Sequence, residues 1–307
     1  MTLPDDYVRY PRRCYGIDND RYDWSILPRR DPIKWPGSAK IALWIVPVLE
    51  YFPMNTPKAP FIPLGGSTTP YPDPRVYSSR DYGSRVGIFR VFKALDKHGL
   101  KASVAFNSAV ATRYPFLLNE VTRRNWEVIA HGVDMAKLHH GELNIETERG
   151  YVRESLSILR EMSGQPVTGW ISPARSESMN TLDLVAAEGV DYVADWVNDD
   201  MPYPMKTASG LIYSMPHTHE LSDQHIIIHM SQTKAEFTEQ LCDHFEMLYR
   251  EADAKGGRVM TLTIHPWCIG QPHRIKALED ALKHIVGYGG VWSATGTEIL
   301  AAFRNLQ

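Results

Sequence analysis

The chain has 307 residues, of which 33 are basic and 36 acidic, and a formal net charge of −3. It contains no block of like charges and no basic stripe, which argues against nucleic acid or an anionic membrane as a partner and favours a small neutral or mildly polar substrate. The length suits one large α/β domain or two ordinary ones, and barrels of this size are commonly single domains.

The N-terminal residues and the cysteines bear on the cellular compartment. The chain begins without the basic and apolar regions of a secretory signal and has no apolar run long enough to span a bilayer, so we expect a cytoplasmic protein. Cys14, Cys242 and Cys268 are far apart and lack C-x-x-C spacing. This pattern predicts neither a disulfide framework nor a cysteine zinc site.

Hydrophobic periodicity divides the chain into an arm and a barrel. Residues 1–38 have no period of 2 or 3.6 and are rich in Pro, Arg, Tyr and Asp, which predicts an extended arm. From 39 to 307, strands alternate with helices, which predicts one α/β domain whose parallel sheet closes, or nearly closes, into a barrel. The predicted strands are 41–49, 101–106, 127–130, 167–171, 192–194, 211–214, 226–228, 259–264 and 290–293. The predicted helices are 83–98, 115–124, 146–162, 181–188, 234–254, 272–284 and one at the C-terminus.

Residues 51–80 interrupt this alternation. They are rich in proline and contain two adjacent glycines. A structureless insert of this length after the first strand of a barrel is usually an active-site lid or a substrate loop, so we expect a lid here.

Several of the predicted strands end in polar residues. In barrels of parallel strands the functional residues lie at the C-terminal ends of the strands. The polar ends are Glu50, His131, residues 172–175, residues 195–200 and His265.

His265 and Glu50 are the first candidates for catalysis. His265 follows the apolar run 259–264 and precedes a proline, so it is a candidate acid or base; a histidine that only bonds a backbone carbonyl gives the same pattern. Glu50 follows an apolar strand that is expected to raise its pKa toward the working range of a general base. The alternative is a solvated carboxylate at the rim.

The other strand ends offer groups that bind a substrate or a metal. His131 is a candidate metal ligand or polarising group, although no tight spacing such as H-E-x-x-H supports a metal. Arg175 and Arg85 are candidates to orient a carboxylate, urea or imide through a bidentate fork, or else to pair with an acidic side chain at the rim. On an extended segment His217 and His219 would share a face, so they are candidate pocket residues or else an exposed pair in a loop. Trp196 and Trp267 are candidates to clamp a flat substrate or simply to pack.

Three motifs carry a resemblance to a known family. Residues 81–90 (DYGSRVGIFR), 198–203 (NDDMPY) and 269–274 (IGQPHR) are similar to motifs of the polysaccharide deacetylase superfamily (NodB homology, carbohydrate esterase 4), in the branch that contains the metal-independent allantoinases. The resemblance implies a distorted TIM-like (β/α)₇ barrel, hydrolysis of an amide-type C–N bond, and a homotetramer or another homo-oligomer. The arm is then expected to dock on a neighbouring subunit.

The sequence departs from the deacetylases where their metal is bound. Their T-x-D-D motif, which supplies the base and a metal ligand, is replaced by residues 48–50 (VLE), so only Glu50 is left. Their H-S-x-x-H motif maps onto His131 to Met135, and a thioether replaces the second histidine ligand. Residues 172–177 (SPARSE) also differ from T-G-R-T-G-P of the allantoinase branch, so the substrate is expected to differ.

These observations predict a hydrolase of a small linear or cyclic amide, such as a ureide, hydantoin or imide, without a cofactor. Glu50 is expected to position or deprotonate water, Arg175 to hold the developing oxyanion, and His265 to protonate the leaving nitrogen. The substrate pocket is expected to contain His131, Arg85, Trp196, Asn198, Asp199, Trp267 and His217. The alternatives are a metal-dependent N-deacetylase with zinc on Glu50, His131 and Asp134, and an inactive barrel that binds a ligand.

Overall fold

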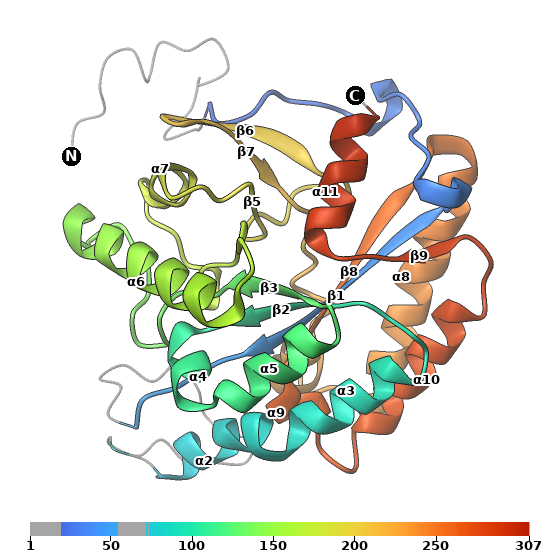
Figure 1. Ribbon diagram of the computed structural model, residues 1–307. Helices are drawn as coiled ribbons and strands as arrows, with labels where there is room; N and C mark the ends of the chain where they lie inside the picture. Colours follow the sequence, from blue (N-terminus) through green and yellow to red (C-terminus); the bar gives the residue numbers. More distant parts are fainter. Residues whose placement is uncertain (1–19, 55–71, 73, 307) are drawn as a thin grey trace.

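The computed structural model describes residues 20–54, 72 and 74–306, and its strands form one curled sheet (Figure 1). The strands are β1 (Ile41–Leu49), β2 (Ser103–Phe106), β3 (Glu127–Ala130), β4 (Gly169–Trp170), β5 (Tyr192–Val193), β6 (Tyr203–Thr207), β7 (Gly210–Ser214), β8 (Arg258–Ile264) and β9 (Val291–Ser293). Their order is β6-β7-β5-β4-β3-β2-β1-β8, and β9 pairs with the first residues of β1.

All paired strands are parallel except β6 and β7. The predicted α/β fold class is therefore confirmed, as a half-barrel. Among the described strands β7 does not pair with β8. Instead, Thr261 Oγ1 of β8 donates a hydrogen bond of 2.6 Å to the carbonyl of Pro216, just after β7, and so links the two sides of the opening.

Most helices lie on the outside of the sheet, whereas the C-terminal helix α11 (Gly296–Asn305) packs against its other face through Ile299, Leu300 and Phe303 (Figure 1). The α-helices are α2 (Pro74–Tyr82), α3 (Ile88–Asp96), α4 (Ser108–Arg113), α5 (Pro115–Arg123), α6 (Ile145–Ser163), α7 (Thr181–Ala187), α8 (Lys234–Lys255), α9 (Pro266–Ile269), α10 (Ile275–Val286) and α11 (Gly296–Asn305). Short 3₁₀ segments are η1 (Leu27–Arg29), η2 (Pro36–Ser38) and η4 (Pro173–Arg175), and π-helical segments are η3 (Gly83–Gly87) and η5 (Gln224–His229).

Two hydrophobic clusters lie on the two faces of the sheet, and β1, buried along its whole length, contributes to both. Leu43 and Ile45 pack in the outer cluster under the helices, whereas Trp44 and Val46 pack in the inner one. This period of two follows from the pleat of a strand. It decides which side chains beyond the strand ends face the inside of the curl.

Two predicted elements differ from the structure, and some observed elements were not predicted. Residues 226–228, predicted as a strand from their three isoleucines, lie in η5, where Ile226 and Ile227 are buried and the chain is π-helical. Residues 74–80, expected within a structureless lid, belong to α2; residues 55–71 and 73 lie outside the described part. β6 was not predicted, and it forms a hairpin with β7.

The described part of the arm packs against its own barrel. Arg21 forms an ion pair of 2.8 Å with Asp183, and Arg30 binds both carboxylate oxygens of Asp199 at 2.6 Å. The docking of the arm on a neighbouring subunit stays a prediction, and residues 1–19 lie outside the described residues. No helix in the described ranges is long and apolar enough to cross a membrane.

Candidate active site

Strand alternation brings several polar side chains to the inside of the curl. Trp44 and Val46 of β1 belong to the inner cluster. Glu50 follows β1 directly and lies an even number of residues from both, so its side chain also faces the inside of the curl. The same alternation holds at other strand ends. His131, His217 and His265 each lie an even number of residues after a member of the inner cluster, namely Ile129, Met215 and Val259. The edge formed by the C-terminal ends of the strands is therefore lined with histidines and one glutamate.

His265 is oriented by a buried carboxylate, Asp223. Its Nδ1 lies 2.8 Å from Asp223 Oδ1, and Asp223 also accepts hydrogen bonds from the backbone N–H groups of His265 and Ile269. Because a carboxylate is only an acceptor, Nδ1 carries the proton in this pair, and the tautomer leaves Nε2 of a neutral His265 as an acceptor. Among the described residues Nε2 has no hydrogen-bond partner, so it is free to exchange a proton with a substrate.

Glu50 lies in a shell of cations and N–H donors. Its Oε1 is 3.9 Å from His131 Nε2, and its Oε2 is 3.7 Å from Arg80 Nη1 and 3.4 Å from the Trp267 indole nitrogen. Arg80 is itself held over the rings of Trp267 and Phe52, with its guanidinium carbon 3.7 and 4.4 Å from the ring centroids.

The expectation that burial raises the pKa of Glu50 is wrong. Burial does oppose ionisation, but the facing His131 and the electrostatic interactions with His265 and Arg80 outweigh it and lower the pKa of Glu50 to about 2. Glu50 is therefore ionised at neutral pH. The sequence could not show this, because Arg80 reaches the site from α2.

Arg175 is held by two imidazoles. Its Nη1 donates to His217 Nε2 at 3.0 Å, and its Nη2 to His219 Nδ1. Burial, followed by the charge of Arg175, lowers the pKa of His217 to about 3, so this ring is neutral and acts as an acceptor. Arg175 also lines a cavity of about 390 Å³ together with Trp196 and Asn198.

Asn107 ties two strand ends together. Its Oδ1 accepts a hydrogen bond of 2.8 Å from the backbone N–H of Tyr51, and its Nδ2 donates to the carbonyl of His131. The Nδ1–H of His131 donates to the carbonyl of Ile171 at 2.9 Å, so Nε2 is the nitrogen that faces Glu50. The sequence analysis did not name Asn107, although it directly follows β2 and the strand-end rule would have identified it. Asp223 and Arg80 do not follow a strand, so that rule could not identify them.

The comparisons with known proteins agree with this fold. A family model described as polysaccharide deacetylase matches residues 68–193. A "Putative polysaccharide deacetylase" of Schizosaccharomyces pombe is 23% identical over 303 residues, 89% of this chain and 93% of the relative. A "Peptidoglycan deacetylase" of Helicobacter pylori is 22% identical over 256 residues, 72% of this chain and 85% of the relative. Residues 68–193 are therefore similar to the polysaccharide deacetylase family.

Two solved structures share the fold of this chain over nearly its whole length. Puue allantoinase has a TM-score of 0.82 at 24% identity, and a probable polysaccharide deacetylase from Pseudomonas aeruginosa PAO1 has a TM-score of 0.80 at 24% identity. Each comparison covers 92% of this chain and 98% of the other. The NodB-type architecture predicted from the motifs is thereby confirmed.

Among the described residues, the side chains around Glu50 and His131 do not fit a three-ligand metal centre. Glu50 and His131 face each other, but Asp134 Oδ1 caps a turn by accepting from the backbone N–H groups of Ala136 and Lys137. In the described ranges no three His, Cys, Asp or Glu side chains converge as metal ligands. Only two of the three candidate ligands therefore meet.

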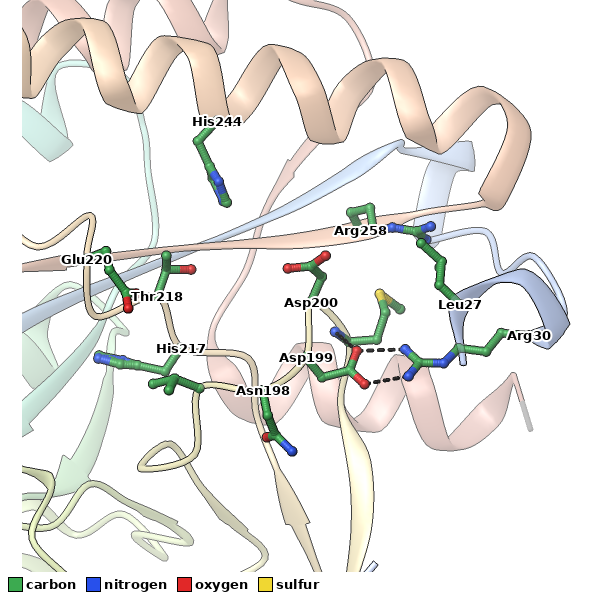
Figure 2. Close-up of a pocket in the computed structure, with 12 residues that line it drawn as sticks. Leu27, Arg30, Asn198, Asp199, Asp200, His217, Thr218, Glu220, His244 and Arg258 are labelled. Atoms are coloured by element: carbon green, nitrogen blue, oxygen red, sulfur yellow. Dashed lines mark hydrogen bonds and ion pairs between the residues drawn. The ribbon is translucent and has the colours of Figure 1, made fainter. Parts of the chain in front are cut away.

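Two predicted pocket residues, Arg85 and Asp199, have other partners. The Arg85 side chain is 74% exposed and lies 3.8 Å from Asp81, so the arginine that reaches Glu50 is Arg80. Asp199 forms an ion pair with Arg30 and lines a separate cavity of about 370 Å³, drawn in Figure 2. His217 and Asn198 also line that cavity.

Proposed function

We propose that the chain hydrolyses the amide-type C–N bond of a small linear or cyclic amide, of the ureide, hydantoin or imide class. The observation that carries this proposal is His265, whose Nδ1 is fixed on buried Asp223 and whose Nε2 is free, beside an ionised Glu50. A histidine oriented in this way is a proton-transfer group, because the carboxylate stabilises the imidazolium that forms.

The roles follow from charge and position. A carboxylate with a pKa of about 2 is a weak base, so Glu50 positions the attacking water as a hydrogen-bond acceptor. Water forms the new C–O bond, its proton passes to His265 Nε2, and His265 returns a proton to the nitrogen as the C–N bond breaks. Arg175, which lines the cavity of about 390 Å³, donates to the oxyanion that develops.

Small amide substrates fit the walls of that cavity. It is lined by the rings of Trp196 and Tyr22 and by the amide of Asn198, so a flat polar molecule finds stacking surface and hydrogen-bond partners together. The likeness to Puue allantoinase supports a ureide among these substrates. None of the steps above uses a cofactor.

A metal-dependent N-deacetylase is the second candidate function. The family match and the likeness to the peptidoglycan deacetylase favour it, and Glu50 with His131 would provide two of its ligands.

A substrate screen separates the candidates. Purified full-length protein, treated with chelator and dialysed, is offered ureides, hydantoins, imides and N-acetylated amino-sugar oligomers, with product release measured before and after zinc is added. We expect turnover of a ureide, hydantoin or imide that zinc does not change. Turnover of the amino sugars that appears only with zinc would favour the second candidate, and no turnover of any compound would favour an inactive barrel.

A further inference from the structure

Residues 172–177 form the short loop that carries Arg175. Both ends of this loop contact one side chain, Asp195. At its start, the backbone N–H of Ser172 donates to Asp195 Oδ1 at 2.8 Å. At its end, the Glu177 carboxyl group lies beside the Asp195 carboxyl group, and both line the same cavity. Glu177 Oε2 accepts from the indole N–H of Trp196 at 3.1 Å.

The backbone between these two contacts is strained. Ala174 and Arg175 have φ values of 55° and 53°, in the left-handed region. Residues other than glycine pay about 1–2 kcal/mol each for this conformation, so it persists only where the surroundings impose it. The two contacts therefore maintain the backbone that aims Arg175 at His217 and His219.

The contact between the two carboxyl groups requires a proton. A carboxylate has no donor, so two ionised groups cannot hydrogen-bond to each other. Glu177 Oε1 and Asp195 Oδ2 are buried, and among the described residues no N–H or hydroxyl group donates to either of them. One shared proton satisfies both oxygens.

The surroundings of the two carboxyl groups favour the protonated form of one of them. Burial is the largest cause that raises the pKa of both groups, and the charge of Asp195 raises the pKa of Glu177 further. The basic groups that face the pair are Arg21 from the arm, Arg175 from the loop and the imidazole of His131 from the end of β3. Arg21 is already bound by Asp183, and Arg175 donates to imidazoles.

We propose that Glu177 and Asp195 share one proton at neutral pH and act as a pair of positioning residues that keep Arg175 in its working orientation. Loss of the proton in alkaline solution turns the contact into a repulsion and releases the end of the loop. The consequence for turnover rests on the proposed function, whereas the shared proton itself does not.

Infrared difference spectroscopy tests the shared proton without any substrate. At neutral pH the full-length protein should show the C=O band of a protonated carboxylic acid, and the band should disappear on titration to alkaline pH. Glu177→Gln should remove it, whereas Glu154→Gln, which changes an exposed glutamate paired with Lys137, should leave it in place. A wild-type spectrum without this band, or a band that survives Glu177→Gln, would overturn the proposal.

The pH profile of turnover tests the positioning role. Glu177→Ala should lower kcat/KM about 10- to 100-fold, mainly in kcat, because a small displacement of an oriented group is costly. Glu177→Gln and Asp195→Asn each supply an amide donor in place of the shared proton, so both should restore most of the loss and abolish the alkaline decline of wild type. If both amide variants keep that decline, the pair does not position Arg175. If no amide is hydrolysed, the proposed function fails and the infrared result still stands.

Discussion

At the scale of single residues, the site depends on which nitrogen of His265 faces the substrate. Asp223 decides this by accepting from Nδ1 while two backbone N–H groups hold its carboxylate in place. The strand-end rule could predict Glu50, His131 and His265, because each follows its strand directly. It could not predict Asp223, which lies 42 residues from His265 in sequence and reaches it only through the tertiary fold.

Removing either member of this pair should lower activity with the fold intact. We expect His265→Ala to reduce kcat/KM by about 10²–10⁴, the contribution of a general acid or base. Asp223→Asn should lose about as much, since an amide presents an N–H to Nδ1 and favours the wrong tautomer. Both variants are tested by steady-state kinetics on the substrate found in the screen, and circular dichroism checks that they fold. Full activity of Asp223→Asn would show that Asp223 has only a structural role.

Glu50 should make folding stability depend on pH in the acid range. Its folded pKa of about 2 lies below the value of 4.5 for a free glutamate, so its contribution is complete above about pH 4.5 and is lost as the pH falls toward 2. The shift corresponds to about 3 kcal/mol. Urea unfolding at a series of pH values should show the stability difference between wild type and Glu50→Gln narrowing by about this amount. A constant difference would mean that Glu50 has an ordinary pKa.

At the scale of elements, periodicity predicted most of the fold. The nine residues of β1 and the amphipathic faces of α6, α8 and α10 gave strong patterns, and their predicted bounds agree with the structure within a few residues. The isoleucines of η5 misled the prediction because a short apolar run fits a buried strand and a buried helix equally well. Only the packing of Ile226 and Ile227 in the core decides between them.

The glycines of the motif DYGSRVGIFR allow η3 to approach α9. A Cβ added at Gly87 would lie 2.0 Å from the carbonyl oxygen of Pro266. Gly87→Ala should therefore push α9, with Trp267, away and cost about 1–3 kcal/mol of stability. The matched control is Gly150→Ala in α6, where a Cβ meets nothing within 4 Å, and a gain of about 0.5–1 kcal/mol is expected. Equal effects of the two substitutions in urea unfolding would contradict this account.

At the scale of the whole molecule, the composition of the arm predicted an extended segment but gave no indication of where it lies. Residues 20–38 run over the barrel and are fixed by a few contacts that are distant in sequence, Arg21 with Asp183 and Arg30 with Asp199. Such partners cannot be paired from one sequence, because acidic residues are available at many surface positions. Within this segment, the ring of Trp35 lies in the inner cluster.

Trp35 should anchor this segment to the barrel. Its side chain is 1% exposed, its indole N–H donates to the carbonyl of Arg258 at 2.9 Å, and its ring packs beside Trp292. Trp35→Ala should lower the free energy of unfolding by about 3–5 kcal/mol, the usual cost of emptying a large buried site. Trp24→Ala, in the same segment but 78% exposed, should change it by less than about 0.5 kcal/mol. Denaturant unfolding measures both variants, and light scattering shows whether either changes the mass of the particle. A Trp35→Ala protein as stable as wild type would show that the segment lies on the barrel without stabilising it.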